Sequence, residues 1–158
     1  MLLRNEEVRD IIDTITSKVV LILGRFTNER KRVLDALRQE LRTRNLTPIV
    51  FDFEKPASRD LTETIITLAS MARFVIADIT DAKSIPQELS HIIPNLPSVP
   101  IQPVLLASDR EYAMFERWKQ YPWVLPEFLY EDEAHLLASL TDKVVGPAEQ
   151  KREEQTAG

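Results

Sequence analysis

The residues best placed to do chemistry in this sequence follow short apolar runs. Gly24, Arg25, Phe26 and Thr27 come directly after the run Val19–Leu23. If a helix begins there, its free backbone N–H groups and the Arg25 guanidinium could bind an anion. The spacing matches neither GxxxxGK[ST] nor GxGxxG, so a tight turn followed by an ordinary helix cap is an equally good interpretation.

Asp78 ends another apolar run, at the position where response-regulator receivers carry a phosphoacceptor aspartate. A receiver also needs an acidic pair after its first strand and a lysine after its fifth, and this sequence offers neither. Phosphotransfer is therefore a poor hypothesis. Asp78 or Thr80 could simply cap the following turn, and contact between Asp78 and a nucleotide is the functional alternative.

Glu88 lies in the first turns of a short helix expected over residues 84–93, with Ser84 at its start. A carboxylate there could stabilise a ribosyl oxocarbenium ion or accept a hydrogen bond from a ribose hydroxyl. A surface glutamate that complements the helix dipole is the other interpretation. His91 gives only one Glu-x-x-His pair, and the chain has no cysteine, so we expect no metal site.

Alternating strands and amphipathic helices must position these residues. The apolar periodicity predicts strands over residues 19–23, 47–53, 73–78, 101–107 and 128–130, and helices over residues 6–15, 28–44, 58–72, 84–93, 109–121 and 132–145. Such alternation predicts an α/β fold, a flavodoxin-like three-layer sandwich with a parallel five-stranded sheet of order 2-1-3-4-5 and helices on both faces.

The predicted strand order also indicates where a ligand would bind. Ligands of such sheets lie outside the carboxyl ends of the strands, where the strand order reverses. Here that point falls between the first and third strands, which brings residues 24–28, residues 78–84 and the helix that carries Glu88 to one edge. We therefore expect a single site there.

The composition describes one mildly acidic domain. The chain has 158 residues, with 25 acidic against 20 basic side chains and a net charge of −5, so we expect no nucleic-acid partner. The apolar runs fall short of the ~20 residues that a membrane span needs. With no basic leader, a cytoplasmic location is the expectation.

Three parts are expected along the chain. A leading amphipathic helix over residues 1–16 could pack on the domain, continue a connector or mediate self-association. The α/β domain covers residues 17–147. Gly146 and Pro147 are expected to end the last helix, which leaves residues 148–158 as a disordered polar tail.

Several segments together resemble a TIR-like domain, particularly the bacterial group described as predicted nucleotide-binding TIR-like proteins. They are Val20–Arg25, the helix Glu29–Leu41, the strand Leu46–Val50 and the loop Glu54–Thr62. In TIR enzymes a glutamate on the third helix, often followed by leucine, serves in cleaving NAD⁺ at the nicotinamide–ribose bond. The resemblance implies this catalytic role for Glu88, with NAD⁺ as a substrate and no cofactor.

The resemblance also implies binding and assembly surfaces. The nucleotide would be bound by Gly24, Arg25, Phe26, Thr27, Asp78 and Ser84, and the loop after the second strand would support self-association through Lys55, Pro56, Ser58, Arg59 and Asp60. Two features depart from the family pattern. Ser84-Ile85 replaces the usual Trp-Cys pair, and the loop after the first strand lacks the usual Ser-Tyr start.

Three functional hypotheses follow. The first is an NAD⁺ glycohydrolase that acts in bacterial signalling or antiphage defence. The second is a non-catalytic TIR-like nucleotide-binding or self-assembly module. The third is a nucleoside deoxyribosyltransferase-like enzyme, because Phe74–Thr80 is similar to a strand of nucleoside 2-deoxyribosyltransferases.

Overall fold

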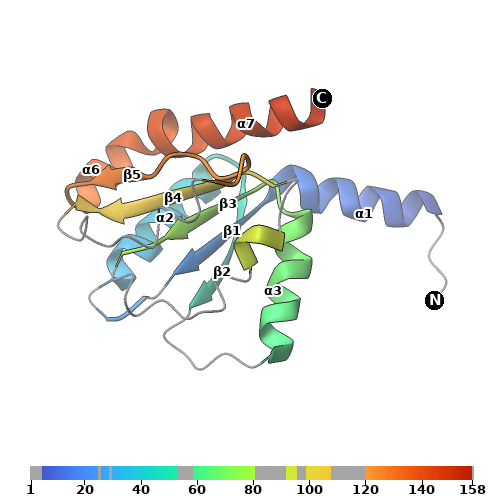
Figure 1. Cartoon of the computed structure of the whole chain (residues 1–158), viewed down its shortest axis with the longest axis horizontal. Helices are drawn as coiled ribbons and strands as arrows, with labels where there is room; N and C mark the ends of the chain where they lie inside the picture. The colour runs from blue at the N-terminus through green and yellow to red at the C-terminus, as the bar shows by residue number, and fades with distance from the viewer. Residues whose placement is uncertain are drawn as a thin grey trace.

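The computed structural model describes residues 5–24, 26–28, 30–52, 59–80, 92–95, 99–107 and 120–157. Its centre is one parallel sheet of five strands in the order β2-β1-β3-β4-β5 (Figure 1). The strands are β1 (Val19–Gly24), β2 (Thr47–Asp52), β3 (Phe74–Asp78), β4 (Ile101–Leu106) and β5 (Phe128–Tyr130). The predicted fold class and strand order are confirmed.

The helical elements of the described residues connect or flank these strands. They are α1 (Asn5–Lys18), α2 (Lys31–Thr43), α3 (Arg59–Met71), the 3₁₀ turn η2 (Ile93–Asn95), α6 (Glu133–Ser139), the π-helical turn η4 (Leu140–Val145) and α7 (Gly146–Ala157). The helices expected over residues 84–93 and 109–121 fall almost wholly outside the described residues. Within the described ranges, no helix is long and apolar enough to cross a lipid bilayer.

Two apolar layers cover the sheet. On one face, α3 packs Ile65 and Ala69 against alternate residues of β1 and β3. On the other face, α2 contributes Leu37 and Leu41, and the segment from α6 to the start of α7 joins them. Because β1 and β3 are buried on both faces, they appear in the sequence as continuous apolar runs, as central parallel strands do.

The C-terminal segment differs from the sequence prediction. Gly146 and Pro147 do not end a helix: they begin α7, which runs to Ala157 through most of the expected polar tail. Proline is tolerated in a first turn because the missing N–H has no partner there. Side chains hold α7 to the domain, since Ala148 is buried and Glu149 pairs with Arg73 at the start of β3.

The N-terminal helix α1 extends away from the sheet (Figure 1). It contacts α3 and β1. Along its outer part, the side chains of Val8, Ile11 and Ile12 are 39%, 49% and 42% exposed. An apolar stripe of this kind is unusual on a free helix, because apolar side chains at helical spacing normally face a core.

Candidate functional site

The carboxyl ends of β1 and β3 lie side by side, as the strand order predicts. Gly24 is the register partner of Asp52 on β2 and of Asp78 on β3. Asp78 is in turn the register partner of Val104 on β4. The two predicted site residues Gly24 and Asp78 therefore meet at the switch point of the sheet.

Asp78 is the centre of a buried polar network. Its side chain is 3% exposed and forms an ion pair with Arg30, the residue that precedes α2. The same carboxylate oxygen, Oδ2, accepts a hydrogen bond from the Tyr130 hydroxyl at 3.2 Å. The other oxygen, Oδ1, accepts the Thr80 backbone N–H at 2.9 Å, which closes the turn after β3. The interpretation of Asp78 as a turn cap is thus confirmed.

Thr80 and Tyr130 complete the network. The Thr80 hydroxyl oxygen accepts hydrogen bonds from Arg30 at 3.2 Å and from the Leu106 N–H at 3.1 Å. It lies 3.2 Å from the Tyr130 hydroxyl, which also accepts a hydrogen bond from Arg30. The Arg30 guanidinium carbon lies 5.6 Å from the centre of the Tyr130 ring, within cation–π range.

The charges of the network follow from its burial. Burial raises the pKa of Tyr130 to about 12, and the Asp78 carboxylate adds to the rise, so the phenol is neutral at physiological pH. Burial alone would lower the pKa of Arg30, but Asp78 and Tyr130 outweigh it and leave that pKa raised. Arg30 therefore stays charged beside Asp78, and Tyr130 is a neutral hydrogen-bonding partner of both.

Gly24 and Phe26 pack closely beneath this network. A Cβ atom on Gly24 would lie 2.9 Å from the Phe26 ring and 3.2 Å from the Asp78 carbonyl oxygen, so only glycine fits. Phe26 is 1% exposed and belongs to the core on the α2 face. Its backbone N–H donates to the Asp52 carboxylate at 2.9 Å. The side chain of Phe26 is therefore a packing group rather than an exposed surface for a base.

The remaining predicted residues divide into three groups. Thr27 belongs to the turn before α2, where its carbonyl accepts the N–H groups of Arg30 at 2.9 Å and Lys31 at 3.0 Å. The others fall outside the described residues: Arg25, Ser84 and Glu88 of the site, and Lys55, Pro56 and Ser58 of the assembly loop. Arg59 and Asp60 begin α3, but their side chains are not among the described ones.

Sequence reasoning missed Arg30 and Tyr130 as members of the network. Tyr130 ends the fifth strand, so applying the carboxyl-end rule to every strand would have identified it. Arg30 lies within Arg30-Lys31-Arg32 and has the features of an ordinary solvent-exposed helix start. No pattern in the sequence distinguishes it from its neighbours.

The network favours a positioning role over direct contact with a ligand. Both Asp78 oxygens already accept hydrogen bonds within the protein. What the network fixes is Thr80, the last described residue before the segment that contains Ser84 and Glu88. In the described part of the chain, no cluster of three or more histidine or acidic side chains could hold a metal ion.

Comparisons with known proteins establish the fold of the chain but assign it to no family. No family model and no curated protein matches the sequence. Among solved structures, a diflavin flavoprotein A3 from Nostoc sp. is 11% identical, with a TM-score of 0.63 over 87% of this chain and 97% of that one. The CMP N-glycosidase BcmB from Clostridium botulinum is 13% identical, with a TM-score of 0.58 over 77% of this chain and 96% of that one.

A third solved structure extends the range of functions found on this fold. The regulatory domain of the master biofilm regulator CsgD is 14% identical, with a TM-score of 0.50 over 89% of this chain and 99% of that one. At these identities the similarity establishes a flavodoxin-like fold and nothing finer, because one such fold hosts many unrelated functions.

Proposed function

We propose that the chain is a nucleotide-binding N-glycosidase, which cleaves the bond between a ribose and its base, with NAD⁺ as the first candidate substrate. Glu88 is the proposed catalytic carboxylate. It would stabilise the positive charge that develops on the ribose while the glycosidic bond breaks.

The anchored turn after β3 is the observation that carries this proposal. Asp78 and Leu106 hold Thr80 by hydrogen bonds of 2.9 and 3.1 Å. Eight positions separate Thr80 from Glu88, so the carboxylate belongs to a segment whose root is fixed beside the switch point. The proposal requires Glu88 to be held close to the ribose, because a carboxylate displaced by about 1 Å loses much of its effect on a developing charge.

Two further considerations support the reaction class. One structural neighbour is described as a CMP N-glycosidase, and its fold extends over 77% of this chain. The resemblance to TIR-like domains independently suggests N-glycosidic cleavage and assigns the carboxylate to Glu88. Both considerations indicate a substrate in which a ribose is bonded to a nucleobase or to nicotinamide. They differ in which of these groups leaves.

The decisive experiment incubates the purified chain with NAD⁺ and, separately, with CMP, at low and high protein concentration. Released nicotinamide or cytosine is quantified by chromatography. Glu88→Gln keeps the shape of the side chain and removes its charge, so turnover should fall by roughly 10²-fold or more, while substrate binding changes much less.

Glu6→Gln is the matched control, because Glu6 is an exposed carboxylate on α1. It should cleave at the parent rate. A parent chain that cleaves neither substrate at either concentration, or a Glu88→Gln chain as fast as the parent, would refute the proposal.

A second candidate function is a TIR-like self-assembly module without turnover. The exposed apolar side chains Val8, Ile11 and Ile12 on α1 favour it. This candidate requires an apparent mass that rises with protein concentration in the absence of any nucleotide.

A further inference from the structure

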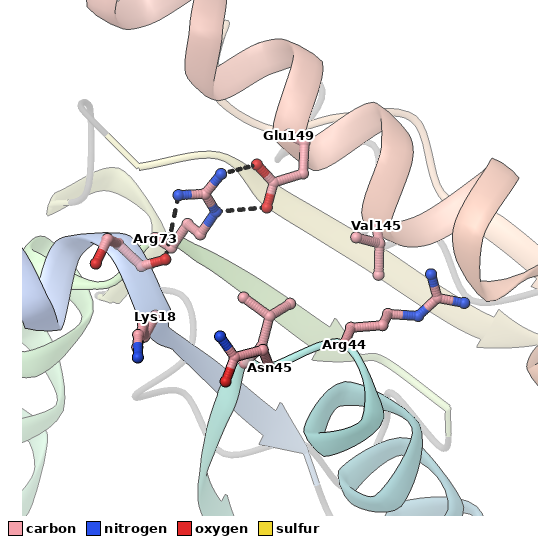
Figure 2. Close-up of a pocket in the computed structure, with 8 residues that line it drawn as sticks. Lys18, Arg44, Asn45, Arg73, Val145 and Glu149 are labelled. Atoms are coloured by element: carbon pink, nitrogen blue, oxygen red, sulfur yellow. Dashed lines mark hydrogen bonds and ion pairs between the residues drawn. The ribbon is translucent and has the colours of Figure 1, made fainter.

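A cavity lies at the amino ends of the strands, opposite the carboxyl ends that hold the Asp78 network (Figure 2). Its volume is about 410 Å³. Three cationic side chains line it from three different elements: Lys18 from the end of α1, Arg44 from the end of α2 and Arg73 from the turn before β3. Glu149 from α7 is the one carboxylate among the described lining residues.

The carboxylate does not balance these cations. Both Glu149 oxygens accept hydrogen bonds from Arg73, one of them from Nε at 2.5 Å (Figure 2). Arg44 contacts Glu40 through one terminal nitrogen at 3.1 Å, while its buried Nε has no hydrogen-bond partner. Lys18 forms no ion pair with any described residue. Two of the three cations therefore retain unused donors.

Attraction to the carbonyls at helix ends is the ordinary explanation for cations in this position. At the end of α2 those carbonyls already have other donors. The Leu41 carbonyl accepts the Leu46 N–H at 3.0 Å, and the Arg42 carbonyl accepts the Asn45 N–H at 3.0 Å. With Asn45 at a φ of 62°, this is a Schellman turn, so the Arg44 side chain is not needed to satisfy it.

At the end of α1 a side chain supplies a donor to one carbonyl. The Ser17 carbonyl accepts a hydrogen bond from Arg73 at 3.1 Å. Each of the three guanidinium nitrogens of Arg73 thus donates to Ser17 or Glu149, and Lys18 remains available. The explanation from helix ends accounts for Arg73. It leaves Lys18 unexplained, and it leaves Arg44 with only its contact to Glu40.

Two cations and two carboxylates meet around Arg73. Arg152 donates to the Arg73 carbonyl at 3.1 Å. Burial lowers the pKa of Arg152, and repulsion from Arg73 lowers it further, although Glu149 acts in the opposite direction. Glu153 contributes a second negative charge near Arg73. The charges around Arg73 therefore balance, and an anion in the cavity would bind through Lys18 and Arg44 instead.

We propose that this cavity is a second ligand site, which binds a small organic dianion, either a phosphate monoester or a dicarboxylate. Lys18 and Arg44 would each contribute a charge-assisted hydrogen bond, and the Asn45 amide a neutral one. Val145 and Leu46 supply an apolar wall for the carbon part of the ligand. The volume lies in the usual range of small-molecule sites, about 300–1,000 Å³.

The test titrates inorganic phosphate, ribose 5-phosphate and succinate into the ¹⁵N-labelled full chain at low ionic strength. Two-dimensional NMR should show saturable shifts at the backbone amides of Lys18 and Asn45 for at least one probe. Lys18→Gln and Arg44→Gln should each weaken that binding on the order of tenfold, the effect of losing one charge-assisted contact. Preference for the phosphates or for succinate tells which dianion the site takes.

Arg42→Gln is the matched control, since Arg42 is an exposed arginine of the same helix end and does not line the cavity. It should bind the probes as the parent does, and so should Glu88→Gln, which separates this site from the glycosidase proposal. Absence of saturable shifts with all three probes would overturn the inference. Equal weakening by Arg42→Gln and Arg44→Gln would overturn it as well.

Discussion

At the scale of single residues, Tyr130 shows how one phenol couples the charge of the site to its fold. Its ring is completely buried, and its hydroxyl lies between Arg30, Asp78 and Thr80. Ionising that hydroxyl would place a second negative charge beside Asp78 without water to stabilise it. The neutral phenol is therefore part of the folded state.

This coupling predicts a specific loss of stability at high pH. The pKa of Tyr130 is raised to about 12 in the folded chain, against a reference value of 10.0 for an exposed phenol. Between these values the unfolded chain releases the proton first, so the contribution of Tyr130 to stability is complete below pH 10 and is lost as the pH rises toward 12. Urea unfolding from pH 9 to pH 11.5 should show this decline.

Tyr130→Phe isolates the effect. The variant should be less stable than the parent at pH 8, by about 1–3 kcal/mol for the buried partners left unpaired. The difference between the two proteins should shrink as the pH passes 10, because the variant has no phenol to ionise at this position. A difference that stays constant up to pH 11.5 would contradict the assigned pKa.

Whether these residues could be predicted depended on their position rather than their type. Gly24 and Asp78 were predicted because each ends an apolar run, and the carboxyl-end rule then puts them together. Arg30 was missed because a guanidinium reaches several ångströms from its own backbone. Its partner Asp78 lies 48 residues further along the chain, a distance that no local pattern encodes.

At the scale of elements, the join between η4 and α7 decides how far the C-terminal helix extends. In an α-helix each backbone N–H donates to the carbonyl four residues earlier. Here the Gly146 N–H donates to the Thr141 carbonyl, five residues earlier. This wider turn carries the chain past Pro147 without interrupting the helix. The sequence predicted that the helix ends at Gly146-Pro147 because glycine and proline are helix breakers. The local pattern does not show the wider turn that accommodates them.

The join makes an unusual prediction for Gly146→Ala. In an ordinary helix this change stabilises by about 1 kcal/mol, and the φ of −56° at Gly146 is normal for alanine. A Cβ atom there would, however, lie 2.6 Å from the Thr141 carbonyl oxygen, which is backbone and cannot rotate away. Gly146→Ala should therefore lower the thermal midpoint, and hydrogen exchange should accelerate in α7.

Ser139→Ala provides the comparison, because it also removes a weaker helix former, one turn or more before the join, and its side chain makes no capping hydrogen bond. Its thermal midpoint should match or exceed that of the parent. If Gly146→Ala were more stable than the parent, the π-helical turn would not be part of the native state.

At the scale of the whole molecule, the carboxyl ends and the amino ends of the strands differ in how their charges are paired. The carboxyl edge holds a cation and an anion that neutralise each other in the Arg30–Asp78 pair. The amino edge retains unused donors on Lys18 and Arg44. The two proposed ligands would therefore bind by different means, one next to the Glu88 carboxylate and the other through the cations Lys18 and Arg44.

At the amino ends of the strands, the N-terminal helix α1 and the C-terminal helix α7 are both hydrogen-bonded to Arg73. Arg73, just before β3, donates to the Ser17 carbonyl at the end of α1 and to Glu149 on α7. The base of α1 is fixed in this way while its outer part extends into solvent (Figure 1). Any surface on α1 is thus held in a defined direction relative to the sheet, which favours specific contacts between copies.

Self-association through α1 is the last prediction. Ile11 is 49% exposed between Val8 and Ile12, so Ile11→Asp should leave the thermal midpoint nearly unchanged while it places a charge in the middle of the stripe. In sedimentation velocity, the parent should gain mass with concentration and Ile11→Asp should remain monomeric. Asp10→Asn, an exposed change on the same helix, should associate as the parent does. If Arg59→Glu alone abolished association, the surface would be the predicted assembly segment that includes the start of α3 instead of the stripe. A parent that stays monomeric at every concentration would exclude both surfaces.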